Sequence, residues 1–233
     1  DYQSLEDAIH ALMTEVKEKL TAINPDILIE FRQSYIGPSI RKYGNMLRVG
    51  DCPCDILKNR FNAVNLRLTS GKTAVHSDMI MWNMEDSVEN AALQFTSILY
   101  TVPQVSVRVD KLPEDHYKML KFYIDFWKEW REVLLDGKLT ATNPESEYSL
   151  VCSTFENKAV FTAYNDSVIS VKTEIAVAVN ATAKKHLIIK NAENYSYKVL
   201  NCMGEEMSNG TIENHLQEIR VPVAGMIIAE KIS

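Results

Sequence analysis

Segments with helical periodicity alternate with short apolar runs over the first 137 residues of the chain. Apolar residues recur at helical spacing in four segments, which predicts helices over residues 4–20, 55–68, 87–100 and 113–135. The apolar runs between them predict strands over 26–31, 44–51, 73–78 and 103–108. Strands that alternate with helices in this order indicate parallel βα units. Four such units are half of a (β/α)8 TIM barrel, which usually needs about 250 residues.

The boundaries of these helices carry their own signals. Ser4 is the expected N-cap of the first helix. Pro113 opens the last helix, where its missing N–H costs nothing, and Gly137 closes it. The first helix has one apolar stripe, expected to face a core, formed by Leu5, Ala8, Ile9, Leu12, Val16 and Leu20.

Polar and charged residues gather where the predicted strands end. The candidates are Glu30, Arg32, Arg48, Asp51, His76 and Asp78, with Trp82 shortly after the third strand. In α/β barrels the chemistry lies at the carboxyl ends of the strands. His76 and Asp78 share one side of their strand by the period of two.

The pattern changes after Gly137 to alternating apolar and polar positions broken by turn residues. Eight short strands are predicted, over 148–155, 158–164, 167–171, 175–179, 186–190, 196–202, 217–223 and 226–232. Asn165-Asp166, Gly204-Glu205 and Asn209-Gly210 are turn signals. Strands at this spacing indicate an antiparallel β-sandwich. The predicted fold class is therefore α/β plus all-β, with a half barrel over 1–140 and a sandwich over 141–233.

Composition excludes several classes of protein. The 233 residues include 46 % hydrophobic and 24 % charged residues, as expected for a folded globular protein. The 25 Lys and Arg against 31 Asp and Glu give a net charge of −6, which argues against nucleic acid as a partner. No apolar stretch is long enough to span a bilayer and no signal peptide begins the chain, so we expect no membrane association.

The four cysteines show no disulfide-framework spacing. Free thiols in a reducing compartment are expected, which indicates a cytoplasmic location. Cys52 and Cys54 resemble half of a zinc motif, but a second pair of ligands at the right spacing is missing. The roles of these two thiols are left open by the sequence.

Three segments resemble glycoside hydrolase family 36, the melibiase or α-galactosidase-like enzymes. They are 30–38 (EFRQSYIGP), 44–53 (GNMLRVGDCP) and 73–79 (TAVHSDM). The resemblance implies a (β/α)8 barrel followed by a β-sandwich, and a retaining α-glycosidase that acts on an oligosaccharide or glycoside without a metal or cofactor. Asp51 matches the aspartate at the end of the sixth barrel strand, the general acid/base. The nucleophilic aspartate of the fourth strand would lie upstream of Asp1, so this chain alone is expected to be inactive.

The same resemblance makes Glu30, Arg32, Arg48, His76, Asp78 and Trp82 candidate substrate-binding residues. Residues 31–35 differ from the Asn-Cys pair and glycine run with which the family contacts galactose. Arg48 replaces a tryptophan three residues before the acid/base. This arginine pair raises the hypothesis of an anionic or otherwise modified glycan.

Each candidate also has a purely structural interpretation. Asp51 could cap the helix that begins near residue 55, and the charged residues at the strand ends could form a salt-bridge network. His76 and Asp78 could be a buried pair, and Trp82 could belong to the core instead of stacking on a sugar. A metal site built from Asp51, His76 and Asp78 is a further alternative.

Two alternatives concern the whole chain: a carbohydrate-binding or interaction module without chemistry, and a metal-dependent hydrolase. A half barrel also leaves open sheet edges and apolar surface, so we expect a homo-oligomer.

Overall fold

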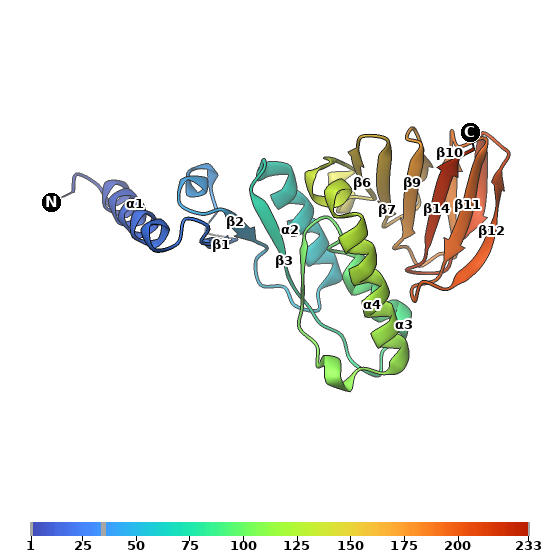
Figure 1. Ribbon diagram of the computed structural model, residues 1–233, viewed down its shortest axis with the longest axis horizontal. Coiled ribbons are helices and arrows are strands. Elements are labelled where there is room, and N and C mark those ends of the chain that lie inside the picture. Colours follow the sequence, from blue (N-terminus) through green and yellow to red (C-terminus); the bar gives the residue numbers. More distant parts are fainter. Residues whose placement is uncertain (1, 34–35, 233) are drawn as a thin grey trace.

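The computed structural model describes residues 2–33 and 36–232 of the chain. Ser34 and Tyr35, within the segment that carries the resemblance, lie outside the described residues. The molecule is elongated, with a lone helix at one end and a β-rich body at the other (Figure 1). No described helix has the length and apolar character needed to cross a membrane.

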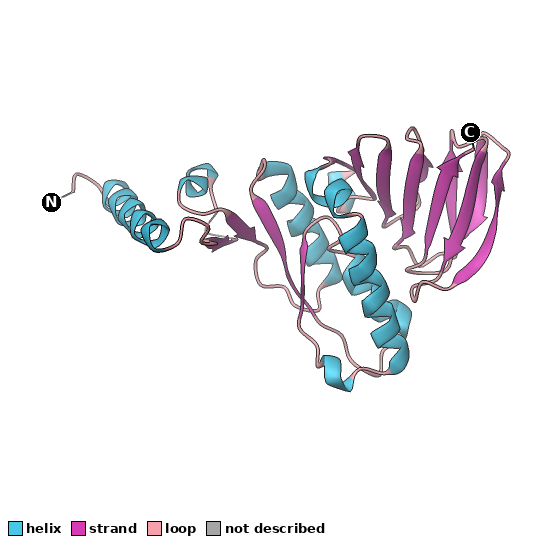
Figure 2. Cartoon of the chain, in the orientation of Figure 1, coloured by secondary structure: helices cyan, strands magenta, loops and turns pink. Residues whose placement is uncertain are grey.

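The amino-terminal part contains a four-stranded sheet in the order β1-β2-β3-β4, with every neighbouring pair parallel. Its strands are β1 (Glu30–Arg32), β2 (Met46–Arg48), β3 (Ala74–Ile80) and β4 (Val102–Val105). The helices around it are α1 (Leu5–Ile23), α2 (Ile56–Thr69), α3 (Val88–Thr96) and α4 (Glu114–Glu129), with short turns η1 (Pro38–Lys42), η2 (Val109–Lys111) and the π-helical η3 (Glu132–Asp136). The predicted alternation of helix and parallel strand is therefore observed (Figure 2).

The first helix begins at its predicted N-cap, Ser4, and α2 begins at a capping residue that the sequence analysis did not name, Asp55. The side chain of Ser4 accepts the backbone N–H of Asp7, and that of Asp55 accepts the N–H of Lys58. Because Asp55 caps α2 itself, Asp51 does not serve as that cap. Gly137 ends η3 at φ −66°, so it is not needed for a left-handed turn. A Cβ there would lie 2.3 Å from the Val133 carbonyl oxygen, which is why a glycine is required.

The carboxyl-terminal part consists of two facing sheets. One has seven strands in the order β12-β11-β14-β9-β7-β6-β5 and the other has three in the order β13-β10-β8. Their bounds are β5 (Lys138–Thr142), η4 (Pro144–Ser146), β6 (Leu150–Phe155), β7 (Lys158–Ala163), β8 (Val168–Ser170), β9 (Ile175–Asn180), β10 (His186–Lys190), β11 (Tyr195–Leu200), β12 (Glu206–Ile212), β13 (Leu216–Arg220) and β14 (Met226–Lys231). The pairs β7–β9 and β8–β10 are parallel, so the expectation of a wholly antiparallel sandwich was wrong in these two places.

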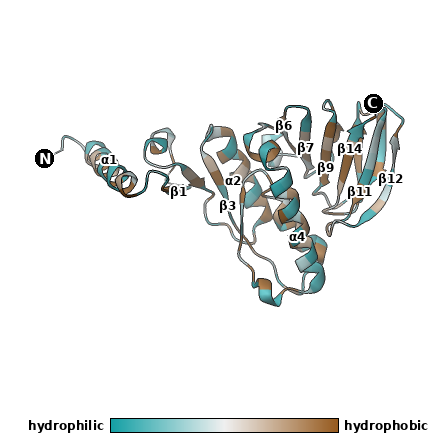
Figure 3. Ribbon diagram, viewed as in Figure 1, coloured by the Kyte–Doolittle hydropathy of each residue, from teal (hydrophilic) through white to brown (hydrophobic). Residues whose placement is uncertain are grey.

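Both faces of the seven-stranded sheet are covered at its central strands. One face packs on the three-stranded sheet through residues such as Ile189, Ile219 and Ile227. The other packs on α3 and α4, whose Phe95 and Met119 belong to the same buried cluster as Val177 of β9. Apolar residues accordingly dominate the central strands (Figure 3). The expected boundary at residue 140 falls inside β5, and the division into 1–140 and 141–233 stays a prediction.

Further sequence predictions differ from the structure. β5 and β12 were missed, and the turn expected at Asn209-Gly210 lies inside β12, a strand whose residues are largely exposed and lack an apolar alternation. β3 continues to Ile80, so Asp78 lies within the strand instead of at its end. α4 gives way to a π-helical turn before residue 135. The apolar stripe of α1 faces solvent, and no residue of that helix is buried.

Candidate functional site

Strand register brings the predicted charged residues to one face of the parallel sheet. Arg32 of β1 pairs in register with Arg48 of β2, and Arg48 with His76 of β3. Residues in register on parallel strands project from the same face. The alternate residues Phe31, Leu47 and Val75 pack together in an apolar cluster on the opposite face. Polar and apolar residues are therefore sorted to opposite faces of this sheet.

Arg48 is the centre of the charged group. Its guanidinium contacts Glu30 at 3.4 Å, Asp51 at 3.1 Å and Asp78 at 2.9 Å. The Arg48 side chain is 13 % exposed. One cation thus binds three carboxylates from two strands and the loop after β2, and the predicted cluster of Glu30, Arg32 and Arg48 is observed together with Asp51 and Asp78.

Asp51 lies on the loop that follows β2, and its side chain is 60 % exposed. Nη1 of Arg32 donates to both of its carboxylate oxygens, at 3.0 and 2.8 Å. Nη2 of Arg48 donates to Oδ1 at 3.1 Å. Beside Asp51 is an open pocket of about 570 Å³, lined by Arg32, Gln33, Ile36, Gly50, Asp51, Lys58 and Asn62. Asp51 is therefore the most exposed carboxylate of this cluster, ahead of Glu30 at 37 %, and it is the one that lines the pocket.

Asp78 has the opposite environment, with no exposed side-chain surface. Its Oδ1 accepts from Arg48 and its Oδ2 from the backbone N–H of Cys52. The side-chain amide of Asn59 on α2 donates to the backbone carbonyl of Asp78 and accepts its backbone N–H. Asp78 therefore fastens the loop that carries Asp51. Burial, with the neighbouring Asp78 charge, raises the pKa of Cys52 to about 12, so this thiol is not a nucleophile at neutral pH.

His76 and Trp82 lie outside the network of hydrogen bonds around Arg48. His76 is half-buried beside Arg48 in register. Trp82 lies past the end of β3, where its Nε1 donates to Nδ1 of His116 at 3.1 Å and its ring packs on the core under α4.

The pocket beside Asp51 contains residues that the sequence analysis did not single out. Lys58 and Asn62 lie one turn apart on α2, and Gln33 follows β1. The Gln33 side chain accepts the backbone N–H of Gly50. The signal for Lys58 and Asn62 was available: the pair has i,i+4 spacing on the helix that follows the Asp51 loop.

No described residues form a group of three or more His, Cys, Asp or Glu suited to hold a metal ion. Among Glu30, Asp51 and Asp78 the space that a cation would take is filled by the guanidinium of Arg48. The candidate metal site of Asp51, His76 and Asp78 is thus not assembled in the described part of the chain.

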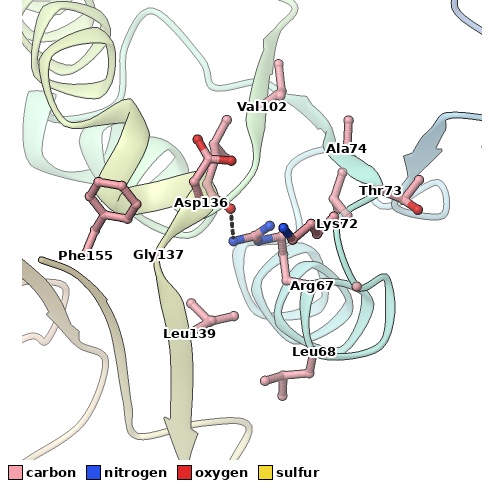
Figure 4. Close-up of a pocket in the computed structure, with 13 residues that line it drawn as sticks. Arg67, Leu68, Lys72, Thr73, Ala74, Val102, Asp136, Gly137, Leu139 and Phe155 are labelled. Atoms are coloured by element: carbon pink, nitrogen blue, oxygen red, sulfur yellow. Dashed lines mark hydrogen bonds between the residues drawn. The ribbon is translucent and has the colours of Figure 1, made fainter.

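A second pocket, of about 720 Å³, lies where β3 and β4 begin, at the opposite end of the sheet from Asp51 (Figure 4). Arg67 donates there to the carbonyl oxygen of Leu135 at 2.7 Å and thereby caps the carboxyl-terminal end of η3. Arg67, Lys72 and Asp136 supply its charged lining. None of the sequence-predicted site residues lines this pocket.

Comparisons with known proteins give matches in structure only. No family model matches the chain, and no curated protein matches its sequence. The galactosidase domain of an α-galactosidase–sucrose kinase superposes with a TM-score of 0.53 at 11 % identity, over 93 % of this chain and 30 % of that one. A family 27 β-L-arabinopyranosidase from Geobacillus stearothermophilus gives 0.57 at 10 % identity, over 95 % and 54 %. A family 36 α-galactosidase from the same organism, in complex with raffinose, gives 0.50 at 12 % identity, over 94 % and 30 %.

The chain thus spans between 30 % and 54 % of the length of these glycoside hydrolases. At such low identity the likeness shows a shared fold. The mixed α/β content with several sheets is that of a glycosidase-like fragment, which confirms the expected fold class at this coarse level. The half barrel itself stays a prediction.

Proposed function

We propose that this chain is part of a retaining α-glycosidase, in which the parallel sheet completes a catalytic (β/α)8 barrel and the sandwich is an accessory domain. The observation that carries the proposal is Asp51, an exposed carboxylate held by two arginines beside an open pocket after a parallel strand. The fold shared with galactosidases supports it. A terminal α-linked sugar of an oligosaccharide is the proposed substrate.

In this proposal Asp51 is the general acid/base. It would protonate the glycosidic oxygen as the leaving group departs, then accept a proton from the water that attacks the glycosyl-enzyme. Retaining hydrolysis needs a second carboxylate, the nucleophile, about 5–5.5 Å from the first. Asp78 does not fit that role, because its side chain has no exposed surface. The nucleophile would come from a barrel strand that this chain does not contain.

Arg48 has a positioning role in this mechanism. It fixes Asp51 against Glu30 and against the buried Asp78, so that the acid/base is held relative to the sheet. Glu30, Arg32 and His76 would contact the sugar from the same face, and Trp82 would border the site from the end of β3.

The test is hydrolysis of a panel of nitrophenyl α-glycosides by the chain extended to a full barrel, with Asp51→Ala. Loss of one acid/base group should lower kcat by about 10³-fold. Asp110→Ala is the matched control, because Asp110 is 61 % exposed and is also held by an arginine, Arg108, at 2.8 Å. This control should keep full activity.

The 233-residue chain alone should not turn over any of these substrates. A well-folded extended protein without turnover on any sugar would contradict the glycosidase. Sugar binding that survives Asp51→Ala and needs only the sandwich would favour a carbohydrate-binding module instead.

A further inference from the structure

The pocket beside Asp51 carries more positive than negative side chains, although the chain as a whole has a net charge of −6. Arg32 and Lys58 are its cations, Asp51 is its one anion, and Gln33 and Asn62 add two amides. In a protein with a net negative charge, a local excess of cations at a cavity favours anionic ligands there.

Of the two cations, Lys58 is the one without a carboxylate partner among the described residues. It is exposed in the first turn of α2 and, among the described residues, no carboxylate lies within ion-pair distance of its ammonium group. Asn62 follows one turn later on the same side of the helix. An ammonium group at the rim of a cavity, with a neutral amide behind it, is available to a ligand.

Arg32, in contrast, forms hydrogen bonds with the Asp51 carboxylate, and the proposed chemistry requires these bonds to break. Its Nη1 donates to both oxygens of Asp51, and Arg48 holds one of them as well. A glycosidic oxygen that is to interact with Asp51 therefore competes with Arg32 for the same two carboxylate oxygens. Arg32 is 41 % exposed whereas Arg48 is 13 % exposed, so Arg32 is the partner able to leave.

We propose that the pocket binds a sugar that carries an anionic group, with the carboxylate of a uronosyl residue as the ligand of Arg32 and Lys58. This inference rests on the proposed function, because it assumes that the pocket is the sugar-binding site. The substrate carboxylate replaces Asp51 as the partner of Arg32 through the paired donors that a guanidinium offers to a carboxylate. Binding of the correct substrate thereby frees Asp51 for acid/base work, and a neutral sugar leaves Asp51 bound to Arg32.

The experiment is a calorimetric titration of the 233-residue chain at low ionic strength with methyl α-galacturonoside and with neutral methyl α-galactoside. Galactose 6-sulfate tests whether another anionic group serves, and acetate tests whether any small anion does. We expect the uronoside to bind at least tenfold more tightly than the neutral sugar. Arg32→Ala and Lys58→Ala should each weaken binding of the uronoside about tenfold, so that either variant loses most of the preference for the uronoside over the neutral sugar.

Arg108→Ala is the matched control, because Arg108 also binds an exposed aspartate but lies away from the pocket. Lys58→Ala guards against misfolding, since Lys58 has an exposed side chain. Tighter binding of galactose 6-sulfate than of the uronoside would keep the anionic pocket and replace the carboxylate with a sulfate. Equal binding of both methyl glycosides, absence of binding, or equal affinity for acetate would overturn the inference.

The two proposals fail separately. If the extended protein hydrolyses a neutral glycoside while the chain shows no preference for the uronoside, only the anionic substrate is wrong. If the chain binds the uronoside through Arg32 and the extended protein hydrolyses nothing, the glycosidase is wrong and the anionic pocket stands.

Discussion

The carboxyl-terminal sandwich and the amino-terminal segment differ in how their apolar surface is covered. The central strands of the seven-stranded sheet are buried on both faces, by the three-stranded sheet and by α3 and α4. The sheet region around β1 and β2 rests on a cluster of six buried residues, and α1 buries none. Most of the free energy of folding is therefore expected to come from the part after β3.

Hydrogen bonds of buried tyrosines join the helices to the sandwich. The Tyr100 hydroxyl donates to the carbonyl of Val151, and the Tyr123 hydroxyl donates to that of Ala224. These contacts span the boundary expected from the change of sequence pattern. The change in hydrophobic pattern near residue 137 therefore does not mark the edge of a hydrophobic core, because one core extends across it.

The largest expected difference between the two regions is in the response to leucine truncation. Leu99 is fully buried in the core under α3, whereas Leu12 on α1 is 59 % exposed. Leu99→Ala should lower the free energy of unfolding by about 4 kcal/mol, through lost burial and the cavity left behind. Leu12→Ala should change it by less than about 0.5 kcal/mol. Urea denaturation at the lowest usable protein concentration measures both, and similar losses would contradict the comparison.

Arg48→Met tests whether the charged cluster stabilises the weaker region. It leaves Asp78 buried without its cation, which should cost about 3 kcal/mol in the same measurement. Arg108→Met should leave stability unchanged, because its pair with Asp110 is exposed. The double variant Arg48→Met, Asp78→Asn should recover much of the loss. A neutral effect of Arg48→Met alone would show that water replaces the guanidinium.

Alkaline pH should weaken the shared core in a tyrosine-dependent way. Burial raises the pKa of Tyr123 well above its usual range, so the folded protein favours the neutral phenol. An unfolded tyrosine ionises near pH 10, so stability is constant below that value and falls as pH rises above it, by up to about 1.4 kcal/mol per pH unit for each such group. Tyr123→Phe should make this fall shallower, although it costs about 1 kcal/mol at neutral pH. Tyr117→Phe, at an exposed position of the same helix, is the control.

The sequence predicted the elements whose signals are local. The start of the first helix followed from Ser4, and the order of the parallel strands followed from their alternation with helices. β12 was missed because a largely exposed strand needs no apolar alternation, and a glycine within it looks like a turn. Periodicity also predicted an inward stripe on α1, since spacing specifies which face is apolar and not what covers it.

The candidate site was predicted as a set of residues but not as a geometry. That Glu30, Arg32, Arg48, Asp51 and Asp78 meet follows from their positions at the ends of neighbouring strands. Which carboxylate is accessible depends on two further facts: β3 extends past Asp78, and the loop after β2 folds back over it. Neither can be derived from the spacing of charges, and it was the family resemblance that assigned the acid/base role to Asp51 and substrate binding to Asp78.

The smallest expected effect on monomer stability concerns the exposed stripe of α1. Leu5, Ile9 and Leu12 are exposed, and the helix lies at one end of the molecule, where its contacts with Lys42 and Tyr43 leave this stripe uncovered (Figure 1). We expect a second copy of the chain to cover this stripe, because matching apolar stripes on two helices bury each other. Sedimentation at micromolar concentration should show a dimer. Leu12→Glu should shift it to monomer without changing the unfolding midpoint of the dilute protein, whereas Glu15→Gln on the same helix should not. A monomeric parent chain under these conditions would contradict the expectation and leave the stripe to a segment outside this chain.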